Sequence, residues 1–539
     1  MENKKWTRRE VIGSIAGIPL TASLELMSFS NIIQKNSNAV RCKLLNKDGE
    51  LYDEKKMGRF YICDLQLSPF RIDPQFSPGE IVFIPEIKPF RISLPVEVPG
   101  FGEVFLYADN LGKGYTAKSL EETGVLFLNY EFAADRLATV KRIAEECKKA
   151  GLTLSSGTQK RIDSSGKFLI QAKASGKDEK AAAKWAMESL RESLYAGEMA
   201  VIERAEHAIE KRGSRPGFLF GCNSFRFRDA DSPYSKAFTS LFNFATLPFY
   251  HGSIEKVKGQ PDYSRVDVQL KALQNTNIIY KGHPLIFLTP GVTPDWAKNK
   301  TPGEIIDICL KYIRTTIQKY RGRIHIWDVV NEAHVQPDMD YGKEEMIKGY
   351  TKENAVELSC AAAKAARETD PTCFRVINST GTWTDYYMGR NPAPWQQSVY
   401  DYLKMLGSDV GLQYYHSGRD LLEFERNIES FSGFNKPIHI TELQIPSSSS
   451  EVKGADWWGG GVGGSRFPWH GSEFTETIQA DWVEGIYKIL YSKPYIDAIT
   501  WWDLSDPAFV PHGGMLNSDM SPKESYNRLK SLLDKWKMV

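Results

Sequence analysis

In this chain, residues 324–332 read Ile-His-Ile-Trp-Asp-Val-Val-Asn-Glu. This stretch is an apolar run rich in β-branched residues, typical of a buried strand, and it ends on the carboxylate of Glu332. Residues 437–443, Pro-Ile-His-Ile-Thr-Glu-Leu, repeat this design around Glu442. A carboxylate at the end of a buried strand lies at the mouth of a core, where burial and neighbouring charges tune its pKa. Because the two glutamates are far apart along the chain, only a tertiary fold can bring them together.

Both stretches belong to a series of eight short apolar runs that predict strands. In chain order these are Gly217–Cys222, Leu241–Thr246, Ile278–Leu288, Ile324–Val330, Phe374–Ile377, Val410–Tyr415, Pro437–Thr441 and Ala498–Trp502. Helical patterns lie between most of them. Eight strand and helix units in residues 216–539 predict an α/β fold, a (β/α)8 TIM barrel, whose active sites form at the C-terminal strand ends. Glu332 follows the fourth strand and Glu442 the seventh, so both are expected at one rim.

The residues before the barrel predict a β-rich module and a connecting helix. Residues 38–177 contain short strand-like runs separated by Pro and Gly, followed by one helical pattern at Ala133–Ala150. Residues 178–215 form one long helical pattern that stops at Gly213 and Pro216 and is expected to connect the module to the barrel. The module is either a carbohydrate-binding domain or a structural spacer, and its sequence does not distinguish the two.

Residues 1–37 resemble a twin-arginine export signal. Two lysines and the pair Arg8-Arg9 precede a mostly apolar stretch from Val11 to Leu24. The alternative is a disordered basic tail with a short core helix, because Glu25 interrupts the apolar run. Export predicts a periplasmic or secreted protein. No other stretch approaches the ~20 apolar residues that a membrane span needs.

Composition and motif content exclude several classes of function. The 68 basic and 67 acidic residues give a net charge of +1, which does not support nucleic acid as a partner. The chain has no phosphate-binding loop, dinucleotide fingerprint, zinc-ligand spacing or nucleophile elbow, so no cofactor or metal is predicted. Its seven cysteines show no CxxC spacing and predict buried free thiols rather than a disulfide framework.

The barrel half, residues 216–539, resembles a glycoside hydrolase family 10 xylanase. In that family a Trp-Asp-Val-Val-Asn-Glu run carries the acid/base and an Ile-Thr-Glu-Leu run carries the nucleophile, and both occur here at 327–332 and 440–443. Two carboxylates also suit glycosidic bond cleavage on chemical grounds. Further fragments stand in the family's order: Gly282-His283-Pro284-Leu285, Thr293-Pro294-Asp295-Trp296, Asp370-Pro371 before Asn378, Gly411-Leu412-Gln413, and Thr500-Trp501-Trp502 before Asp506.

The resemblance implies retaining hydrolysis with Glu442 as nucleophile and Glu332 as acid/base. It predicts carboxyl groups about 5–5.5 Å apart. Asn331 would hydrogen-bond the sugar 2-hydroxyl or the nucleophile, and His283 and Gln413 would be neighbours of the site.

Tryptophans near the last two strands predict contacts with sugar. Trp502 is expected to be a sugar platform, whereas the adjacent Trp501 should point to the opposite side of the strand, into the core. After the seventh strand, a glycine-rich loop contains several aromatic residues and predicts either a lid over the cleft or an ordinary surface loop. Its residues are Trp457, Trp458, Gly459–Gly464, Trp469 and His470.

Several positions depart from the family pattern. The family's Trp-His-Ser segment is replaced within Phe287–Pro290, and its Glu-Asn-Glu-Met-Lys-Trp run by Pro248–Ser253. The Asp after the nucleophile motif is Gln444, and the histidine after Gln413 is shifted by one place to His416. In the family, that histidine and Asp brace the nucleophile, so His416 is expected near the site with a weaker partner.

These departures predict that the cleavage machinery is kept and the cleft remodelled. The preferred function is a retaining, endo-acting, xylanase-like β-glycanase whose substrate is a decorated xylan, another β-linked glycan or a short oligosaccharide. One alternative is a noncatalytic glycan-binding protein derived from such an enzyme. Another is a barrel glycosidase that acts on a different β-glycan. A monomer without a nucleic-acid partner or membrane span is expected.

Overall fold

In the computed structural model, the described residues are 39–538, with gaps at 66, 68, 71, 86–88, 117–119, 121–123, 339–345, 384–400, 404–407, 417, 451–466 and 472. From Val40 onward the chain forms one compact unit. The predicted export signal, residues 1–37, lies outside the described residues. So do Trp457, Trp458 and Gly459–Gly464 of the loop after the seventh barrel strand.

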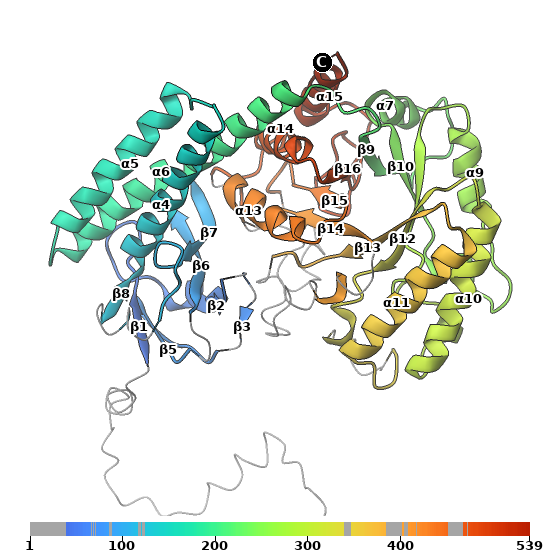
Figure 1. The fold of residues 1–539 in the computed structure, drawn as a ribbon, viewed down its shortest axis with the longest axis horizontal. Helices are drawn as coiled ribbons and strands as arrows, with labels where there is room; N and C mark the ends of the chain where they lie inside the picture. The colour runs from blue at the N-terminus through green and yellow to red at the C-terminus, as the bar shows by residue number, and fades with distance from the viewer. Residues whose placement is uncertain are drawn as a thin grey trace, which may run out of the picture. The chain divides into compact units, whose positions relative to one another are not determined.

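Eight parallel strands close into a barrel in the order β10-β11-β12-β13-β14-β15-β16-β9, which confirms the predicted (β/α)8 fold (Figure 1). The strands are β9 (Leu219–Asn223), β10 (Phe244–Pro248), β11 (Ile279–His283), β12 (Ile326–Asn331), β13 (Phe374–Ser379), β14 (Asp409–Tyr415), β15 (Ile438–Gln444) and β16 (Ile496–Trp501). The second and third predicted runs differ most from the observed strands. Leu241 ends a helix instead of beginning β10, and β11 stops at His283 because Pro284 cannot donate a ladder hydrogen bond.

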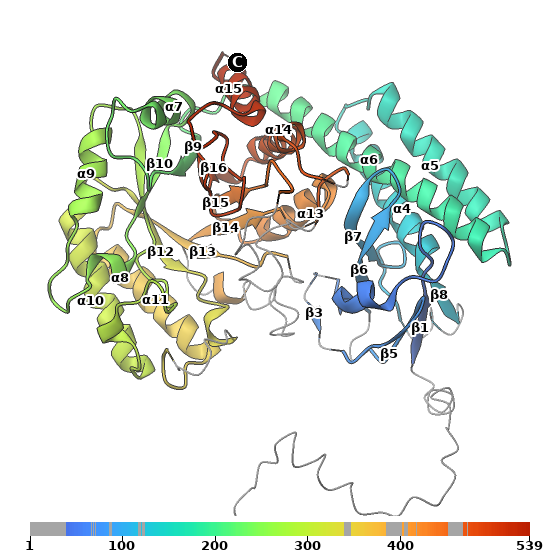
Figure 2. The same cartoon turned by 180° about the vertical axis from the view of Figure 1, so that it is seen from behind.

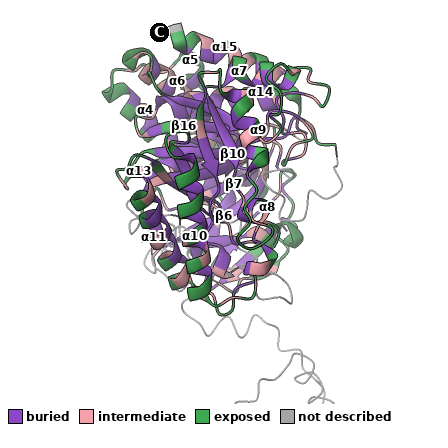
Figure 3. Ribbon diagram, turned by 90° about the vertical axis from the view of Figure 1, so that its right-hand side faces the viewer, coloured by how far each residue is buried: buried purple, intermediate pink, exposed green. Residues whose placement is uncertain are grey.

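Helices cover the outside of the barrel (Figure 2). They are α7 (Pro233–Leu241), α8 (His251–Ile254), α9 (Ser264–Leu273), α10 (Pro302–Tyr320), α11 (Lys352–Thr369), α13 (Leu421–Ser432), α14 (Glu476–Ser492) and α15 (Glu524–Met538). Local sequence sets their starts: at α10, Thr301 and Glu304 form a reciprocal capping box. Because the helices cover one face and inward side chains fill the other, the strands are buried on both faces, which accounts for their largely apolar sequences (Figure 3).

Two four-stranded sheets form the N-terminal region, in agreement with the predicted β-rich module. One has the order β4-β5-β1-β8 and the other β3-β2-β6-β7, and their side chains share one apolar core. The strands are β1 (Val40–Lys43), β2 (Tyr61–Cys63), β3 (Pro69–Phe70), β4 (Gln75–Ser77), β5 (Glu80–Phe83), β6 (Arg91–Val98), β7 (Gly102–Ala108) and β8 (Val125–Phe127). The domain boundaries drawn from the sequence stay predictions.

Three helices follow these sheets, where the sequence predicted two. α4 (Leu128–Lys149) and α6 (Glu179–Arg212) match the predicted patterns, but α5 (Ser156–Ala174) was missed. The prediction of a single helix within residues 38–177 was therefore wrong, because both α4 and α5 lie there. α5 carries two glycines and buries few apolar side chains, so its helical pattern is weak. It packs along α6, where the hydroxyl groups of Ser165 and Ser189 lie 3.0 Å apart.

The cysteines are free, as predicted, and all but the half-buried Cys360 are buried. In the part of the chain that the structure describes, no helix is both long and apolar enough to cross a bilayer.

The N-terminal region packs against barrel loops that follow β14 and β15. On β7, the Phe105 N–H donates to the Gly418 carbonyl at 3.0 Å. On α6, the buried carboxylate of Glu198 accepts hydrogen bonds from the Leu421 N–H at 3.0 Å and from Trp469 Nε1 at 2.8 Å. These contacts hold two loops at the rim where the strands end.

Trp469 and His470 are anchored by the same contacts and do not form a lid. Their rings stack at 3.7 Å, and His470 Nε2 also contacts the carboxylate of Glu198. Trp469 is only 7% exposed. The prediction of a lid is therefore wrong for these two residues, because a buried carboxylate holds both rings in place.

Replacing Arg136 by methionine should destabilise the protein by about 3–5 kcal/mol, because a buried carboxylate loses its cation. The Arg136 side chain is 6% exposed and joins α4 to the start of α13 through Asp420 and Glu423. Urea unfolding measures the loss. The matched control is the double variant Arg136→Met, Asp420→Asn, in which the introduced asparagine would still cap α13 and Glu423 keeps its ion pair with Arg426 at 2.7 Å. Its loss should be smaller, and an equal loss would contradict a role for charge.

Candidate active site

Glu332 and Glu442 lie at the same rim of the barrel. Glu332 directly follows β12 and has a left-handed backbone conformation, with φ of 53°. Its N–H donates to the Asn378 carbonyl at 2.8 Å, which holds this turn. A glutamate in this conformation is strained, and such strain is retained where surrounding contacts determine the geometry. Glu442 lies within β15 instead of after it, because β15 continues to Gln444.

A β-bulge at Thr441 turns Glu442 into the barrel. On β14, Leu412 pairs with the residue before Thr441, whereas Gln413 pairs with Glu442, so Thr441 is an extra residue on β15. The Thr441 hydroxyl lies 3.1 Å from the Leu412 carbonyl and also contacts Asn378 Oδ1. The side chains of Thr441 and Glu442 therefore both reach Asn378, although consecutive residues of a regular strand point to opposite faces.

Neutral side chains connect the two carboxylates. Gln413 Nε2 lies 2.8 Å from Glu332 Oε1 and 2.9 Å from Glu442 Oε1. A nitrogen this close to both oxygens keeps these two oxygens under about 6 Å apart, which is compatible with the ~5–5.5 Å between the carboxyl groups of retaining glycosidases. Asn378 Nδ2 donates to Glu442 Oε1 at 3.0 Å, and the Tyr415 hydroxyl donates to Glu442 Oε2.

The hydrogen bonds stabilise the ionised form of Glu442 more than that of Glu332. Burial raises the pKa of Glu332 to about 7, and burial together with the charge of Glu332 raises the pKa of Glu442 to about 8. Three neutral donors point at Glu442, which favours its ionised form. Glu332 accepts only at Oε1, from Gln413 and from Asn331 at 3.2 Å, and its buried Oε2 has no partner among the described residues. The pKa directions alone would leave the proton on Glu442, but three donors stabilise its ionised form and Oε2 of Glu332 accepts none, so we assign the proton of the pair to Oε2 of Glu332.

His283 is held beside the site by a buried ion pair. Its Nδ1 lies 2.6 Å from Asp328 Oδ2, which Lys281 Nζ also approaches at 2.8 Å. Burial lowers the pKa of His283, so the ring is neutral and donates Nδ1–H to Asp328. Its Nε2 faces Glu442 Oε1 at 4.0 Å, beyond direct hydrogen-bond distance.

The carboxylates open into a cavity of about 840 Å³. Its walls include the aromatic rings of Phe225, Tyr250, Trp502 and Phe509. Trp502 lies with its ring centroid 5.2 Å from that of His283, whereas Trp501 is fully buried, as the alternation of a strand predicts. A cavity of this size, with aromatic walls and two carboxylates, suits a ligand with both apolar faces and hydroxyl groups, such as a sugar chain.

Comparison with known proteins identifies the family. The model of glycosyl hydrolase family 10 matches residues 220–531. The chain belongs to this family. "Endo-1,4-beta-xylanase 5-like" from Arabidopsis thaliana is 32% identical, with 61% of this chain and 53% of its own length covered. Endo-1,4-beta-xylanase B from Thermotoga neapolitana is 25% identical, and the match covers 60% of this chain and 90% of that protein. Among solved structures, xylanase 10B from Thermotoga petrophila RKU-1 in complex with xylobiose is 22% identical. The match covers 61% of this chain and 96% of that chain, with a TM-score of 0.45. The chain spans about half the length of the plant relatives.

His416, which was expected to support Glu442 in this family 10 site, bonds a backbone carbonyl instead. His416 Nε2 bonds the Phe467 carbonyl at 2.8 Å, and burial lowers the pKa of His416 to about 4. Side chains alternate along β14, so Gln413 and Tyr415 point to the site and His416 points away. The contacts of His416 do not support the role expected from the sequence. Tyr415, which the sequence reasoning missed, contacts Glu442 in its place, and its spacing of two from Gln413 is the signal that could have found it.

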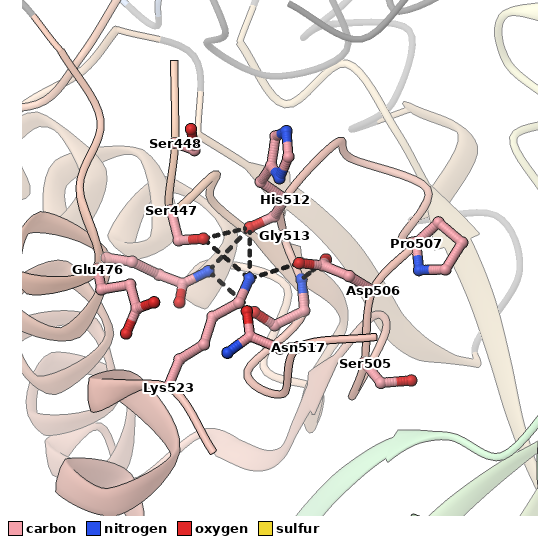
Figure 4. A network of polar contacts seen from close by, with 12 residues as sticks. Ser447, Ser448, Glu476, Ser505, Asp506, Pro507, His512, Gly513, Asn517 and Lys523 are labelled. Carbon is pink, nitrogen blue, oxygen red and sulfur yellow. Dashed lines mark hydrogen bonds and ion pairs between the residues drawn. The ribbon is translucent and has the colours of Figure 1, made fainter. Parts of the chain in front are cut away.

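Gln444, which stands where family 10 has an Asp, supports a neighbouring loop. Its Oε1 accepts a long hydrogen bond of 3.4 Å from the Val510 N–H. The same loop after β16 is held by a buried lysine (Figure 4). Lys523 Nζ lies 2.6 Å from Asp506 Oδ2 and 2.9 Å from Ser447 Oγ, so it joins the loop to the segment after β15. This loop includes the cavity residue Phe509.

Replacing Tyr415 by phenylalanine should lower kcat by about 10- to 100-fold and move the acid limb of the pH profile to higher pH. The Tyr415 hydrogen bond lowers the pKa of Glu442, so its removal raises that pKa and leaves less ionised Glu442 at low pH. Rates of glycoside hydrolysis between pH 4 and 9 measure the shift. Tyr414→Phe is the matched control, because Tyr414 bonds Asn427 instead. An unmoved acid limb in Tyr415→Phe, or the same shift in both variants, would contradict this role.

Proposed function

We propose that the chain is a retaining glycoside hydrolase that cleaves a β-linked polysaccharide, most similar in activity to an endo-1,4-β-xylanase. One observation carries the proposal: Gln413 bridges Glu332 and Glu442 at a separation that suits double displacement. Family membership and the names of the relatives support hydrolysis of a xylan-like glycan. The intact contacts around both carboxylates favour an enzyme over a glycan-binding protein without activity.

In the first step, a carboxylate oxygen of Glu442 attacks the anomeric carbon of the bound sugar. The bond from that carbon to the leaving sugar oxygen breaks, and Glu332 donates its Oε2 proton to this oxygen. The shorter sugar chain leaves with a free hydroxyl group. The other part stays bound to Glu442 as a glycosyl ester, and Glu332 is now ionised.

In the second step, Glu332 removes a proton from a water molecule, whose oxygen attacks the same carbon. The ester bond to Glu442 breaks, and the carboxylate is regenerated with Glu332 protonated again. Two inversions give net retention. The pKa of Glu332 near neutrality suits both its acid and its base role.

The neighbouring residues receive supporting roles in this proposal. We assign Asn331 and Gln413 to hydrogen bonds with the hydroxyl groups of the reacting sugar, and Trp502 to stacking on a sugar face. His283 lines the cavity and is assigned to a hydrogen bond with the same sugar through Nε2. Tyr415 stabilises the ionised Glu442. No step needs a metal or cofactor.

We infer a remodelled substrate preference, because the sugar-gripping segments of family 10 are replaced at Pro248–Ser253 and Phe287–Pro290. Hydrolysis rates and product lengths on unsubstituted xylan, decorated xylans and other β-glycans test this. The expected result is a higher kcat/KM on a decorated or different glycan than on plain xylan. Highest activity on plain xylan would contradict the inference, and no hydrolysis of any β-glycan would favour the glycan-binding alternative.

We also propose that the protein is a monomer exported through its twin-arginine-like segment, residues 1–37. The pair Arg8-Arg9 before an apolar stretch supports export. Changing both arginines to lysine should retain the protein inside cells, as fractionation measures. Unchanged export would contradict this route.

A further inference from the structure

An arginine lies in the wall of the cavity. Arg226 follows β9, is exposed and lines the same cavity as Glu332 and Glu442. Its Nη1 donates to the Ser505 hydroxyl at 3.1 Å and to the Asp506 carbonyl at 3.0 Å, and its Nη2 contacts the Pro507 carbonyl. These acceptors belong to the loop after β16 that Lys523 holds, so this loop fixes the guanidinium group.

The positive charge of Arg226 has no carboxylate partner in the described part of the chain. Among the described residues, no Asp or Glu oxygen lies within 4.0 Å of a guanidinium nitrogen of Arg226, the distance that defines an ion pair. Among the nearby acids, Asp503 accepts from Asn223 Nδ2 at 3.0 Å and from the Phe509 N–H at 2.7 Å. Burial raises the pKa of Asp503, and these hydrogen bonds together with the more distant charge of Arg226 counteract that rise. Asp506 pairs with Lys523 at 2.6 Å. The hydrogen-bond partners of Arg226 are neutral, so its guanidinium group forms no ion pair with a described residue and can pair with a carboxylate of a ligand.

Two further arginines add to the charge at this edge of the cavity. Arg265 donates to the carbonyl of Phe225, itself a cavity residue, at 3.3 Å. Burial and the charge of Arg265 lower the pKa of Arg228. Neither has a described carboxylate within ion-pair distance. Because the whole chain carries a net charge of only +1, this cluster is a local feature.

We propose that Arg226 binds a carboxylate on the substrate, so that the cavity selects a β-glycan bearing a uronic acid. This inference rests on the proposed function, since it names the substrate class of the same site. A guanidinium group can offer two parallel N–H donors to a carboxylate, and the contacts of Arg226 fix its plane in advance. Arg228 and Arg265 raise the local potential and favour approach of an acidic sugar chain. Neutral sugars gain nothing from this charge.

Binding calorimetry on the Glu442→Gln protein tests the site without turnover. The two ligands are a β-1,4-xylo-oligosaccharide with a glucuronic acid branch and the same molecule with its carboxyl group reduced to hydroxymethyl. The acidic ligand should bind about 10- to 100-fold more tightly. Adding Arg226→Gln should bring the two affinities together, whereas Arg226→Lys should keep part of the difference. Arg314→Gln, which removes an exposed charge on α10, is the matched control and should leave the ratio unchanged.

Because Arg226 also anchors the loop after β16, its replacement could disturb that loop. Varying the salt concentration tests the proposal without any variant at Arg226. The affinity ratio should fall as ionic strength rises. Equal affinities for both ligands, including no measurable binding of either, would overturn the proposal, as would an unchanged ratio in Arg226→Gln. A preference for the acidic ligand without hydrolysis by the unsubstituted protein would reject the proposed hydrolysis and leave the carboxylate site standing.

Discussion

Replacing Glu442 by alanine should lower kcat on a β-glycan by about 10,000-fold or more, because no other side chain can form the glycosyl ester. Tyr415, Asn378 and Gln413 all donate to this carboxylate and cannot act as nucleophiles in its place. Steady-state rates on an aryl β-glycoside measure the loss. Added azide should restore turnover in Glu442→Ala, because the small anion occupies the vacated space and attacks the anomeric carbon from the same face.

The product and a matched variant make this expectation specific. A single inversion by azide should give the α-glycosyl azide. Glu442→Gln fills the space of the original side chain, so it should be equally inactive and should not respond to azide. Residual activity above about 1% in Glu442→Ala, far above the loss expected for a nucleophile, or a β-glycosyl azide, would contradict the role of Glu442.

Replacing Glu332 by alanine should have an effect that depends on the leaving group. For an unactivated sugar chain, loss of the general acid should cost about 100- to 10,000-fold in kcat/KM. For an aryl glycoside with an acidic phenol, the first step needs little protonation and should be nearly unaffected. The second step still lacks its base, so azide should accelerate turnover and, after two inversions, give the β-glycosyl azide.

The pH profile provides the second readout for Glu332. Burial raises its pKa to about 7, and the acid step requires the protonated form, so wild-type kcat/KM should fall as pH rises through this region. In Glu332→Ala the alkaline limb should disappear on an activated substrate. An alkaline limb that persists unchanged would assign it to another group and contradict the role of Glu332.

The barrel could be predicted from the sequence because its strands carry their own signal. Runs such as Ile324–Val330 are mostly apolar, since helices cover one face and inward side chains the other. α5 was missed for the opposite reason: Ser156–Ala174 buries little and its helix depends on packing against α6. The contacts between the N-terminal region and the rim loops were also beyond sequence reasoning. They join residues such as Phe105 and Gly418 that no local pattern relates.

The two glutamates could be predicted as a pair, but their surroundings could not. The bulge at Thr441 depends on how β14 and β15 pair, and it places both Thr441 and Glu442 against Asn378. His416 shows how sensitive such assignments are. A shift of one residue along a strand reverses the face, so the histidine points away and Tyr415 takes its place.

The most direct test of the central claim is to trap the covalent intermediate and locate it by peptide-mapping mass spectrometry. A 2-deoxy-2-fluoro β-xylobioside with an activated leaving group should form the ester and slow its hydrolysis, because fluorine destabilises both oxocarbenium-like transition states. We predict one added glycosyl group, located on Glu442, and no label in Glu442→Gln. Label on another residue, or hydrolysis of the parent glycoside with inversion and no adduct, would contradict double displacement through Glu442.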